Sequence, residues 1–462
     1  VTRAKELGMT VIVTDHHEVP CEVTENGEKN YLYVNADAVV DPHRPDCAYP
    51  YKDLCGAGVA YKFIRHLYRV MELPWEGEDA YMDILALGTV CDIMPLTDEN
   101  RIFVKRGLRR LTNSTNLGIN ALKKALGLDG KPIEVHHLSF RIGPSLNSTG
   151  RLESAKEGVE LLLTDDPARA ESLAQDMAKL NELRKEMTDR GVRAATDWVR
   201  KDIRMIPTED GVKEKKIGDD KVIVLYMPGI HESIAGLIAS KLKEAFYRPT
   251  LVFTDAENGH GLKGSGRSIE TYNMFDKLCE HKELFVKVGG HPMAAGFTIT
   301  REALEPLREA LNRDCNLTDA DLVEKLYVDE SCAIKQLTLP LYEELAKLEP
   351  YGTANVRPLF GIVKMGIRSI KMVGNEGQYA RCTFVDGNGT RINGMVFRGK
   401  ELLDNIKVWF GDKECDKILK GLQNHALIDI LYHMKKNEFN GTVSIQMEPV
   451  SIRKSVYYET SK

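Results

Sequence analysis

The sequence predicts an α/β protein in which a parallel-sheet domain is joined by a long helix to a second α/β domain, followed by a C-terminal β-barrel. Three observations predict this class. Residues 1–165 alternate short apolar runs with helical patterns. Residues 168–200 contain no proline and have apolar side chains three and four positions apart, which predicts one or two long helices. From about residue 327, short strand patterns alternate with turn sequences, which favours an OB-fold.

These patterns divide the chain into four expected segments. They are a parallel-sheet domain at 1–165, a connector at 166–220, a second α/β domain at 221–320 and the barrel at 321–462. Within them we expect helices at 53–69, 80–91, 100–111, 231–247 and 339–348, strands at 222–227 and 250–253, and loops at 141–151 and 201–220.

Composition limits the possible environments and partners. The nine cysteines are scattered and form no C-x-x-C pair, which favours a reducing cytosol over a disulfide scaffold or a zinc ribbon. No run of 18 apolar residues is present, so we expect no membrane span. The formal net charge is −5, so a nucleic-acid partner would have to be held by a local basic groove.

The first residues predict a chain that begins inside a larger α/β unit. Residues 2–8 fit the end of a helix with Gly8 at its C-terminus, and a strand follows at 9–13. A parallel strand needs neighbouring strands, and there is no initiator methionine. We therefore expect that an N-terminal portion is missing.

A candidate metal site follows that strand. Val11–Val13 predicts a short buried strand, and Asp15, His16 and His17 stand just beyond it, where ligands bind in open α/β sheets. A carboxylate beside two imidazoles suits Mn, Fe, Co or Zn, and Mg less well. The alternative is that Asp15 caps a turn and that the two histidines are ordinary surface or core residues.

Asp92 is the fourth candidate, at the end of the apolar helix predicted at 80–91. It could equally be a simple helix-terminal residue. If it joins Asp15, His16 and His17, the four side chains could hold two metal ions about 3.5–4 Å apart, the arrangement that clamps both oxygens of a phosphodiester displacement. Two ions need more ligands than these, which again points upstream of Val1.

Three further segments fit contacts to phosphate. Gly264–Arg267 offers glycines that let backbone N–H groups approach an anion, with the Ser265 hydroxyl and the Arg267 guanidinium as donors. The pair Gly289-Gly290 precedes His291, and the predicted loop at 141–151 carries Asn147 and Arg151. Each segment taken alone is also compatible with an ordinary turn.

Together these segments resemble the RecJ family, the single-strand-specific exonucleases of the DHH phosphoesterase superfamily. The resemblance covers essentially the whole chain, and nano-RNases of the same superfamily would share only the DHH and GGH segments. The segments are TDHH at 14–17, ALGTVCDIMPLTDENR at 86–101, RIGPSLNSTGRLESA at 141–155, GSGRS at 264–268, GGHPMAAGF at 289–297 and, before the barrel, EPYG at 349–352.

The resemblance implies a reaction and a set of roles. Residues 1–165 would be the DHH catalytic domain and 221–320 the DHH-associated, substrate-binding domain. Mn²⁺ or Mg²⁺ would activate water to release 5′-mononucleotides from the 5′ end of single-stranded DNA, in recombination and repair. The implied metal ligands are Asp15, His16, His17 and Asp92; the implied contacts to the 5′ end are Ser265, Arg267 and Arg151, with Asn147 and His291 on substrate phosphate.

The barrel would hold single-stranded DNA further along the strand. Tyr379, Phe384 and Phe397 are candidates for base stacking, although aromatic residues of a barrel more often lie in its core. The resemblance further implies a cytoplasmic monomer that works with a single-strand-binding protein and a helicase.

The chain departs from the family in one important way. Relatives carry an upstream strand with paired aspartates, and a further aspartate shortly before the DHH segment, and neither precedes Asp15 here. We therefore expect an incomplete metal site and no activity for the chain as written. A smaller departure is Ser148-Thr149, where alanine is more usual, and we expect little effect.

Two alternatives remain open at this point. The incomplete metal site would suit a non-catalytic fragment that binds single-stranded nucleic acid. A nano-RNase or small-nucleotide phosphatase of the same superfamily is less compatible with the barrel, because a dinucleotide needs no distal contact.

Overall fold

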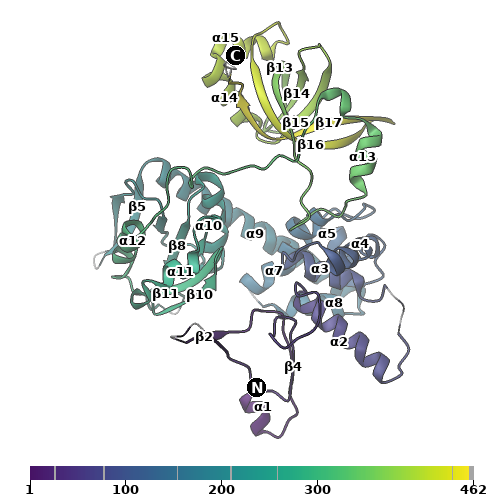
Figure 1. Ribbon diagram of the computed structural model, residues 1–462, viewed down its shortest axis with the longest axis vertical. Helices are drawn as coiled ribbons and strands as arrows, with labels where there is room; N and C mark the ends of the chain where they lie inside the picture. Colours follow the sequence, from purple (N-terminus) through teal and green to yellow (C-terminus); the bar gives the residue numbers. More distant parts are fainter. Residues whose placement is uncertain are drawn as a thin grey trace. The chain divides into compact units, whose positions relative to one another are not determined.

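The computed structural model describes residues 1–456 except 25, 27, 76, 78, 153, 209, 210, 258 and 440, and leaves out the side chains of residues 23, 151, 152 and 439. The chain forms two compact units, which are described separately. One comprises residues 1–111 and 326–462, and the other comprises residues 112–325. Figure 1 labels the elements of each.

The first unit begins with a short helix and a small parallel sheet. Helix α1 (Thr2–Glu6) is followed by Gly8 at φ +76°, as expected, and β1 (Ile12–Thr14) pairs in parallel with β4 (Ala38–Val40). The expectation that β1 is buried is wrong, because Ile12 is 53% exposed. Among the described strands β1 pairs only with β4, and of its two apolar side chains Ile12 is exposed and Val13 is partly buried. A separate antiparallel hairpin joins β2 (Cys21–Val23) to β3 (Lys29–Tyr31).

Three helices follow, close to the expected positions: α2 (Gly56–Val70), α3 (Met82–Cys91) and α4 (Asp98–Thr112). Helix α3 is buried on nearly all sides and ends at Asp92. Helix α4 crosses α3 closely at Gly107, where an added Cβ would lie 2.2 Å from the Met82 carbonyl oxygen. The tight packing of α3 therefore fixes the position at which Asp92 emerges.

The second unit begins with a helical region in which one expectation fails. Residues 141–151, expected to be a loop, lie in a π-helix and in α7 (Gly143–Leu152). Here Ser148 and Thr149 donate their hydroxyl groups to the carbonyl oxygens of Ser145 and Leu146, at 2.6 and 2.9 Å, so side chains typical of turns are accommodated inside a helix. The region contains α5 (Leu117–Ala125), α6 (Val135–His137), the π-helix Leu138–Ile142, α7, α8 (Lys156–Leu163) and α9 (Pro167–Arg200).

Helix α9 is a single helix of 34 residues, within the range expected for the connector. Asp166 caps its start by accepting a hydrogen bond from the Ala168 N–H, and Pro167 occupies the first turn, where it costs no hydrogen bond. The helix carries the chain to a seven-stranded sheet within the same unit.

Among the described strands of this sheet only β7 and β8 pair in parallel, and the order is β10-β11-β9-β8-β7-β5-β6. Ile223 and Leu225 of β7 pack against α9 and α10, while Val224 and Tyr226 face the cluster that includes α11 and α12. The elements are β5 (Ile203–Thr208), β6 (Gly211–Lys216), β7 (Ile223–Tyr226), α10 (Glu232–Phe246), β8 (Thr250–Asp255), β9 (Leu262–Arg267), α11 (Met274–Cys279), the 3-10 turn Lys282–Leu284, β10 (Lys287–His291), β11 (Ala294–Ile299) and α12 (Leu304–Arg313).

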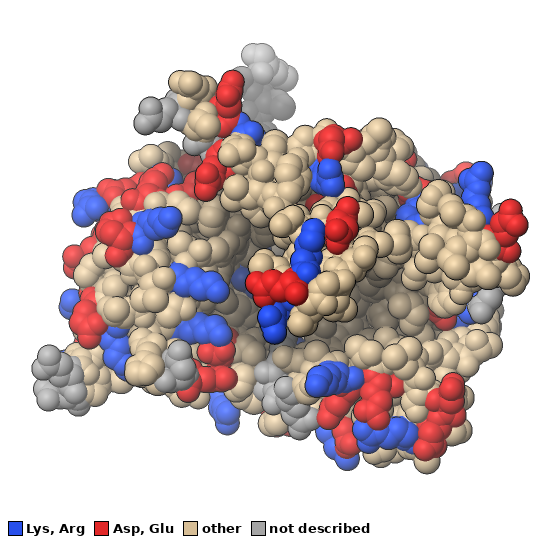
Figure 2. Space-filling model, turned by 90° about the horizontal axis from the view of Figure 1, so that it is seen from below, with Lys and Arg blue, Asp and Glu red and all other residues tan. Residues whose placement is uncertain are grey.

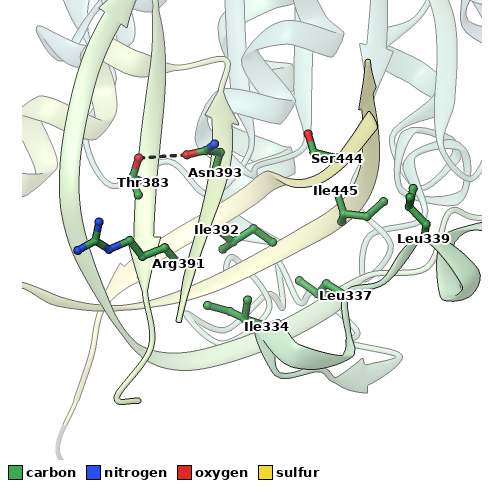
Figure 3. Close-up of a pocket in the computed structure, with 9 residues that line it drawn as sticks. All are labelled: Ile334, Leu337, Leu339, Thr383, Arg391, Ile392, Asn393, Ser444 and Ile445. Carbon is green, nitrogen blue, oxygen red and sulfur yellow. Dashed lines mark hydrogen bonds between the residues drawn. The ribbon is translucent and has the colours of Figure 1, made fainter. Parts of the chain in front are cut away.

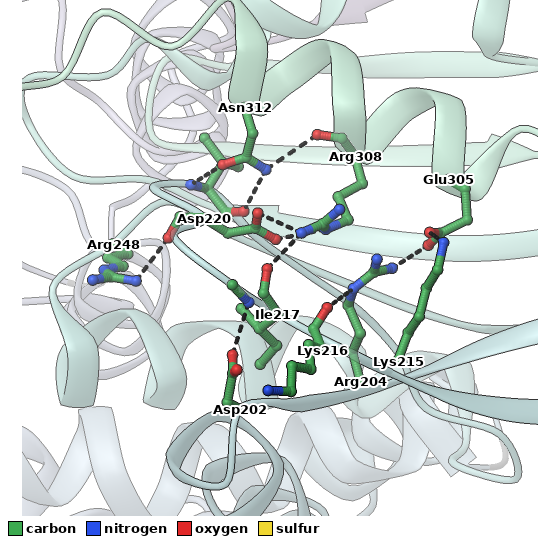
Figure 4. A network of polar contacts seen from close by, with 12 residues as sticks. Asp202, Arg204, Lys215, Lys216, Ile217, Asp220, Arg248, Glu305, Arg308 and Asn312 are labelled. Carbon is green, nitrogen blue, oxygen red and sulfur yellow. Dashed lines mark hydrogen bonds and ion pairs between the residues drawn. The ribbon is translucent and has the colours of Figure 1, made fainter.

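The loop expected at 201–220 is instead the β5–β6 hairpin at one edge of this sheet. Every residue of β6 is exposed, and its lysines suit an edge strand, which explains why its composition suggests a loop. A buried polar network supports the neighbouring strands (Figure 4): Arg308 donates to both carboxylate oxygens of Asp220, at 2.6 and 2.5 Å, and Arg204 pairs with Glu305.

Residues 326–462 of the first unit include a closed barrel, as predicted. The sheet order is β12-β13-β14-β15-β17-β16, and β13 also pairs with β16 to close it. Asp386 accepts hydrogen bonds from the N–H groups of Asn388 and Thr390, which forms the expected turn between β14 and β15. The strands are β12 (Glu330–Ser331), β13 (Phe360–Val373), β14 (Tyr379–Val385), β15 (Arg391–Val396), β16 (Leu427–Phe439) and β17 (Thr442–Lys454).

The barrel also contains helices that the sequence patterns did not reveal. Besides the 3-10 turn Ile334–Gln336 and the expected α13 (Leu339–Ala346), the chain forms α14 (Gly399–Phe410) and α15 (Asp412–Leu419) between β15 and β16. Leu402, Ile406, Cys415 and Ile418 of these two helices are buried in the barrel core.

No described helix is long and apolar enough to cross a membrane. All nine cysteines are free thiols. Basic and acidic side chains intermingle on the face of the molecule shown in Figure 2.

Candidate functional site

The end of β1 gathers Asp15, His16 and His17 into one hydrogen-bonded corner. Asp15 Oδ1 accepts from the backbone N–H groups of His16 and His17, at 2.7 and 3.3 Å, and lies 2.7 Å from His17 Nδ1. Partial burial raises the pKa of the Asp15 carboxyl, but these three bonds outweigh it and hold the pKa below its ordinary value. The carboxylate is therefore ionised near neutral pH.

Asp92 reaches the same corner from the end of α3. Its Oδ2 lies 3.5 Å from His16 Nε2. The start of α2 supports the His16 ring, since a Cβ added at Gly56 would lie 3.4 Å from His16 Cδ2. The structure thus brings together all four side chains that the sequence proposes as metal ligands.

These donors fit a divalent ion by their chemistry, because carboxylate oxygen and imidazole nitrogen suit Mn²⁺ and its neighbours. Their arrangement does not yet form a complete coordination site. In the part of the chain that the structure describes, no group of three or more His, Cys, Asp or Glu side chains is placed to hold a metal ion. The corner instead consists of two pairs, Asp15 with His17 and His16 with Asp92.

A third carboxylate, which the sequence analysis missed, follows the neighbouring strand. Asp41 comes directly after β4 as Asp15 comes after β1, and the Asp15 N–H donates to Val40 O at 3.0 Å. The Asp41 side chain is buried, and His43 Nδ1 lies 3.8 Å from it without a hydrogen-bond partner among the described residues. The sequence does contain a pattern that could have revealed Asp41. An apolar run followed by Asp and His occurs in both VIVTDHH and AVVDPH.

A separate pocket in the second unit fits an anion. A cavity of about 320 Å³ lies between the start of α10 and β9 and is lined by Glu232, Ser233, Gly236, Leu237, Lys263, Ser265 and Arg267. Lys263, Ser265 and Arg267 alternate with buried residues along β9, so they share the face that meets α10. Gly236 lets the helix approach, since a Cβ there would lie 2.9 Å from Arg267 Nη2.

The glycines of this strand have a different role from the one expected. Gly264 and Gly266 lie in β9, on the buried side, and not in a loop that surrounds an anion. A Cβ at Gly264 would lie 2.4 Å from Phe297 Cε2, and one at Gly266 would lie 3.2 Å from Met274 Sδ. The glycines therefore make room for core side chains, and the side chains on the opposite face form the pocket.

The remaining predicted contacts lie elsewhere in the second unit. His291 ends β10 and pairs with Ala294 of β11, which pairs in turn with Arg267 of β9, so these residues occupy neighbouring positions in the sheet. Asn147 is exposed on α7. Arg151 lies in the last turn of the same helix, but its side chain lies outside the described residues.

The barrel presents aromatic and polar side chains on one face of β14 and β15. Tyr379 and Phe397 form an edge-to-face pair with ring centroids 5.8 Å apart, whereas Phe384 is fully buried in the core. A cavity of about 480 Å³ opens nearby (Figure 3). Thr383, Arg391, Asn393 and Ser444 form its polar rim, and Ile334, Leu337, Leu339, Ile392 and Ile445 form its apolar wall.

Comparison with known protein families shows the class of protein to which this chain belongs. Three family models match: the DHH family N-terminal domain at residues 1–89, the DHHA1 domain at 219–316 and the RecJ OB domain at 328–450. This order of domains defines a DHH-superfamily protein with a C-terminal OB domain.

Relatives then identify the family. The chain is 33% identical over 405 residues to the single-stranded-DNA-specific exonuclease RecJ of Bacillus subtilis, a match that covers 87% of this chain and 48% of that protein. It is 31% identical to RecJ of Dickeya dadantii, a match that covers 97% of this chain and 74% of that protein. The chain therefore belongs to the RecJ family. It spans about half the length of the B. subtilis relative.

A solved structure is consistent with this family assignment. RecJ from Thermus thermophilus in complex with Mn²⁺ has a TM-score of 0.75 and 26% sequence identity, and the match covers 99% of this chain and 60% of that one.

Proposed function

We propose that this chain carries the site of a metal-dependent exonuclease that hydrolyses single-stranded DNA in the 5′→3′ direction and releases 5′-mononucleotides. One observation carries the proposal: the ends of β1 and α3 bring Asp15, His16, His17 and Asp92 together. Family membership supports it, since the relatives are named single-stranded-DNA-specific exonucleases.

Asp15, His16, His17 and Asp92 are the residues that would hold Mn²⁺ or Mg²⁺. When bound, such an ion lowers the pKa of a coordinated water and neutralises charge on the scissile phosphate. The Asp15 carboxylate is already ionised, and its bond to His17 Nδ1 favours the tautomer that leaves Nε2 of that ring able to accept.

The pocket between α10 and β9 would hold the terminal phosphate. Arg267 can donate two parallel N–H bonds to a phosphate, and the Ser265 hydroxyl can donate a third. A strand whose terminal phosphate is held there could be cut only from that end, which would give the reaction its polarity. Asn147, Arg151 and His291 remain proposed contacts to the same strand.

The barrel would hold the strand beyond the cut. Tyr379 and Phe397 are proposed stacking partners for bases, and Arg391 beside the barrel cavity is proposed to contact the phosphate backbone. Phe384 no longer supports such a role, because its ring is fully buried.

The test measures mononucleotide release from 5′-labelled single-stranded DNA with Mn²⁺. It uses this chain, the full product of the reading frame that encodes it, and Asp15→Ala in both. We expect the full product to release mononucleotides, and we expect EDTA or Asp15→Ala to abolish that release. No release from the full product, or equal release from its Asp15→Ala variant, contradicts the proposal. Comparing a dinucleotide with a long strand tests the nano-RNase alternative, which requires faster cleavage of the dinucleotide.

A second candidate is a non-catalytic protein that binds single-stranded nucleic acid. The observation that favours it is the lack of a three-donor metal group among the described residues. It requires salt-dependent binding that survives both EDTA and Asp15→Ala, without release of mononucleotides.

A cytoplasmic location, a monomeric state and cooperation with a single-strand-binding protein and a helicase stay predictions. They rest on the family resemblance and on the absence of paired cysteines in the sequence.

A further inference from the structure

The backbone turn that follows Asp92 is strained. Asp92 caps the end of α3, and the next residue, Ile93, has φ +58°, in the left-handed region. The Ile93 N–H donates to Val90 O at 3.2 Å. The Met94 N–H donates to Thr89 O at 3.1 Å, which completes the bonding pattern of a Schellman motif. Glycine is usual at this position, because a β-branched side chain adopts a positive φ only at an energetic cost, so contacts outside the turn must hold it.

The Asn100 side chain provides such a contact. Asn100 lies in the first turn of α4 and is fully buried. Its Nδ2 donates to Pro95 O at 3.0 Å and to Asp53 O at 2.6 Å. Its Oδ1 is buried without a hydrogen-bond partner among the described residues. The amide therefore serves here as a donor of two hydrogen bonds, and losing it would leave two carbonyl oxygens without this donor.

These two carbonyl groups belong to the two sides of the candidate metal corner. Pro95 follows Asp92 by three residues. Asp53 stands just before α2, and the first residue of α2 supports the His16 ring. Asn100 thus ties the segment that carries Asp92 to the segment that supports His16, and the side chains of Asp92 and His16 lie 3.5 Å apart.

Tyr51 reinforces the same connection. Its hydroxyl lies 3.3 Å from Pro95 O and 3.2 Å from Thr97 O, and it can donate to either. A hydroxyl has one proton to donate, whereas the Asn100 amide has two. The contribution of Tyr51 should therefore be the smaller one.

We propose that Asn100 is a positioning residue of the metal site, because its two donated bonds hold the strained turn at Ile93 and thereby keep Asp92 beside His16. The proposal rests on the proposed function in assigning metal binding to this corner. Asn100 acts through the backbone on either side of the corner and is itself no metal ligand.

The first measurement is Mn²⁺ binding by the full product of the reading frame, followed by the electron paramagnetic resonance signal of the free ion. Asn100→Ala should weaken binding by roughly tenfold, as the loss of support around metal ligands commonly does. Tyr51→Phe removes one hydroxyl and is expected to fold, and it should weaken binding by about threefold. Gly118→Ala is the control. It strains the second unit, since its Cβ would lie 1.8 Å from Leu161 O, and it should keep the wild-type Mn²⁺ affinity.

Ile93→Gly separates positioning from packing. Glycine adopts a positive φ without strain, so the turn keeps its shape with less help from its neighbours. Adding Ile93→Gly to Asn100→Ala should therefore restore most of the lost Mn²⁺ affinity. If Asn100 mattered only by filling space in the core, the added glycine would restore none of it.

The second measurement needs no metal. Hydrogen–deuterium exchange of the same proteins in EDTA follows the amides of Ile93 and Met94, whose hydrogen bonds close the turn. Asn100→Ala should speed their exchange, Ile93→Gly should reverse this change, and Gly118→Ala should have no effect.

The inference is overturned if Asn100→Ala binds Mn²⁺ like the wild type, if Gly118→Ala weakens binding equally, or if Ile93→Gly restores nothing. A wild-type full product that binds no Mn²⁺ would count against the proposed function. Amide exchange then decides the role of Asn100 by itself, and unchanged exchange in Asn100→Ala would refute it.

Discussion

Replacing Gly236 by alanine separates folding from ligand binding at the anion pocket. The glycine lies in α10 where that helix meets β9, and the added Cβ would lie 2.9 Å from Arg267 Nη2 and 3.4 Å from Ser265 Cβ. The closest contact is about 0.5 Å short of ordinary van der Waals separation. The neighbour that must give way is the end of a flexible arginine, so we expect the fold to tolerate the change.

Gly236→Ala is expected to stabilise the fold slightly but to weaken phosphate binding. Alanine is better than glycine inside a helix by about 0.5–1 kcal/mol, so Gly236→Ala should unfold at an equal or slightly higher urea concentration than the wild type. A displaced Arg267 would lose part of a charge-assisted bond worth about 1.5–3 kcal/mol. A loss of about half of that bond weakens phosphate binding by roughly three- to tenfold.

The assay pairs urea unfolding with titration of a 5′-phosphorylated single strand in EDTA. Gly158→Ala is the matched control, because Gly158 lies in α8 of the same unit and an added Cβ would approach Leu146 O only to 3.8 Å. It should change stability in the same way without affecting binding. Wild-type affinity for Gly236→Ala, or an equal loss for Gly158→Ala, would refute the reasoning about Arg267.

Three further predictions concern other parts of the chain. Arg308→Ala leaves the Asp220 carboxylate buried without its cation, so the free energy of unfolding measured in urea should fall by about 3–5 kcal/mol. A decrease below about 1 kcal/mol would contradict the role of the pair. Gly118→Ala puts a Cβ 1.8 Å from Leu161 O, where the backbone must move, so it should destabilise by at least about 1–3 kcal/mol instead of stabilising the helix. Phe397→Ala removes a half-exposed ring, so fluorescence anisotropy should show single-strand affinity reduced by about 1–3 kcal/mol at unchanged melting temperature, and unchanged affinity would exclude stacking on this ring.

The sequence alone determined the elements whose pattern is strong and local. The apolar helix before Asp92, the long connector and the barrel strands could be predicted because hydrophobic periodicity and turn residues mark them directly. The family could also be recognised from the order of its motifs, since that order depends on no packing detail.

Local patterns failed where tertiary contacts decide the conformation. Ser148 and Thr149 favour turns in isolation, yet their hydroxyl groups are satisfied inside α7. The charged β6 resembles a loop because an edge strand needs no apolar face. The helices α14 and α15 lie in a segment where strands were expected, and only the folded structure shows that Leu402, Ile406, Cys415 and Ile418 are buried in the barrel core.

In the candidate sites too, the sequence predicted some features and only tertiary contacts decided the others. Residue types and order pointed to Asp15, His16, His17 and Asp92, but only the fold places the end of α3 beside β1 and reveals Asp41 at the end of the adjacent strand. In the second unit the sequence correctly suggested that Ser265 and Arg267 share a site, but the anion-binding role predicted for the neighbouring glycines was wrong. Contacts between residues far apart in the chain assign those glycines to the core and set Lys263 against Glu232 of a helix some thirty positions earlier, because packing and not spacing decides which side chains share a cavity.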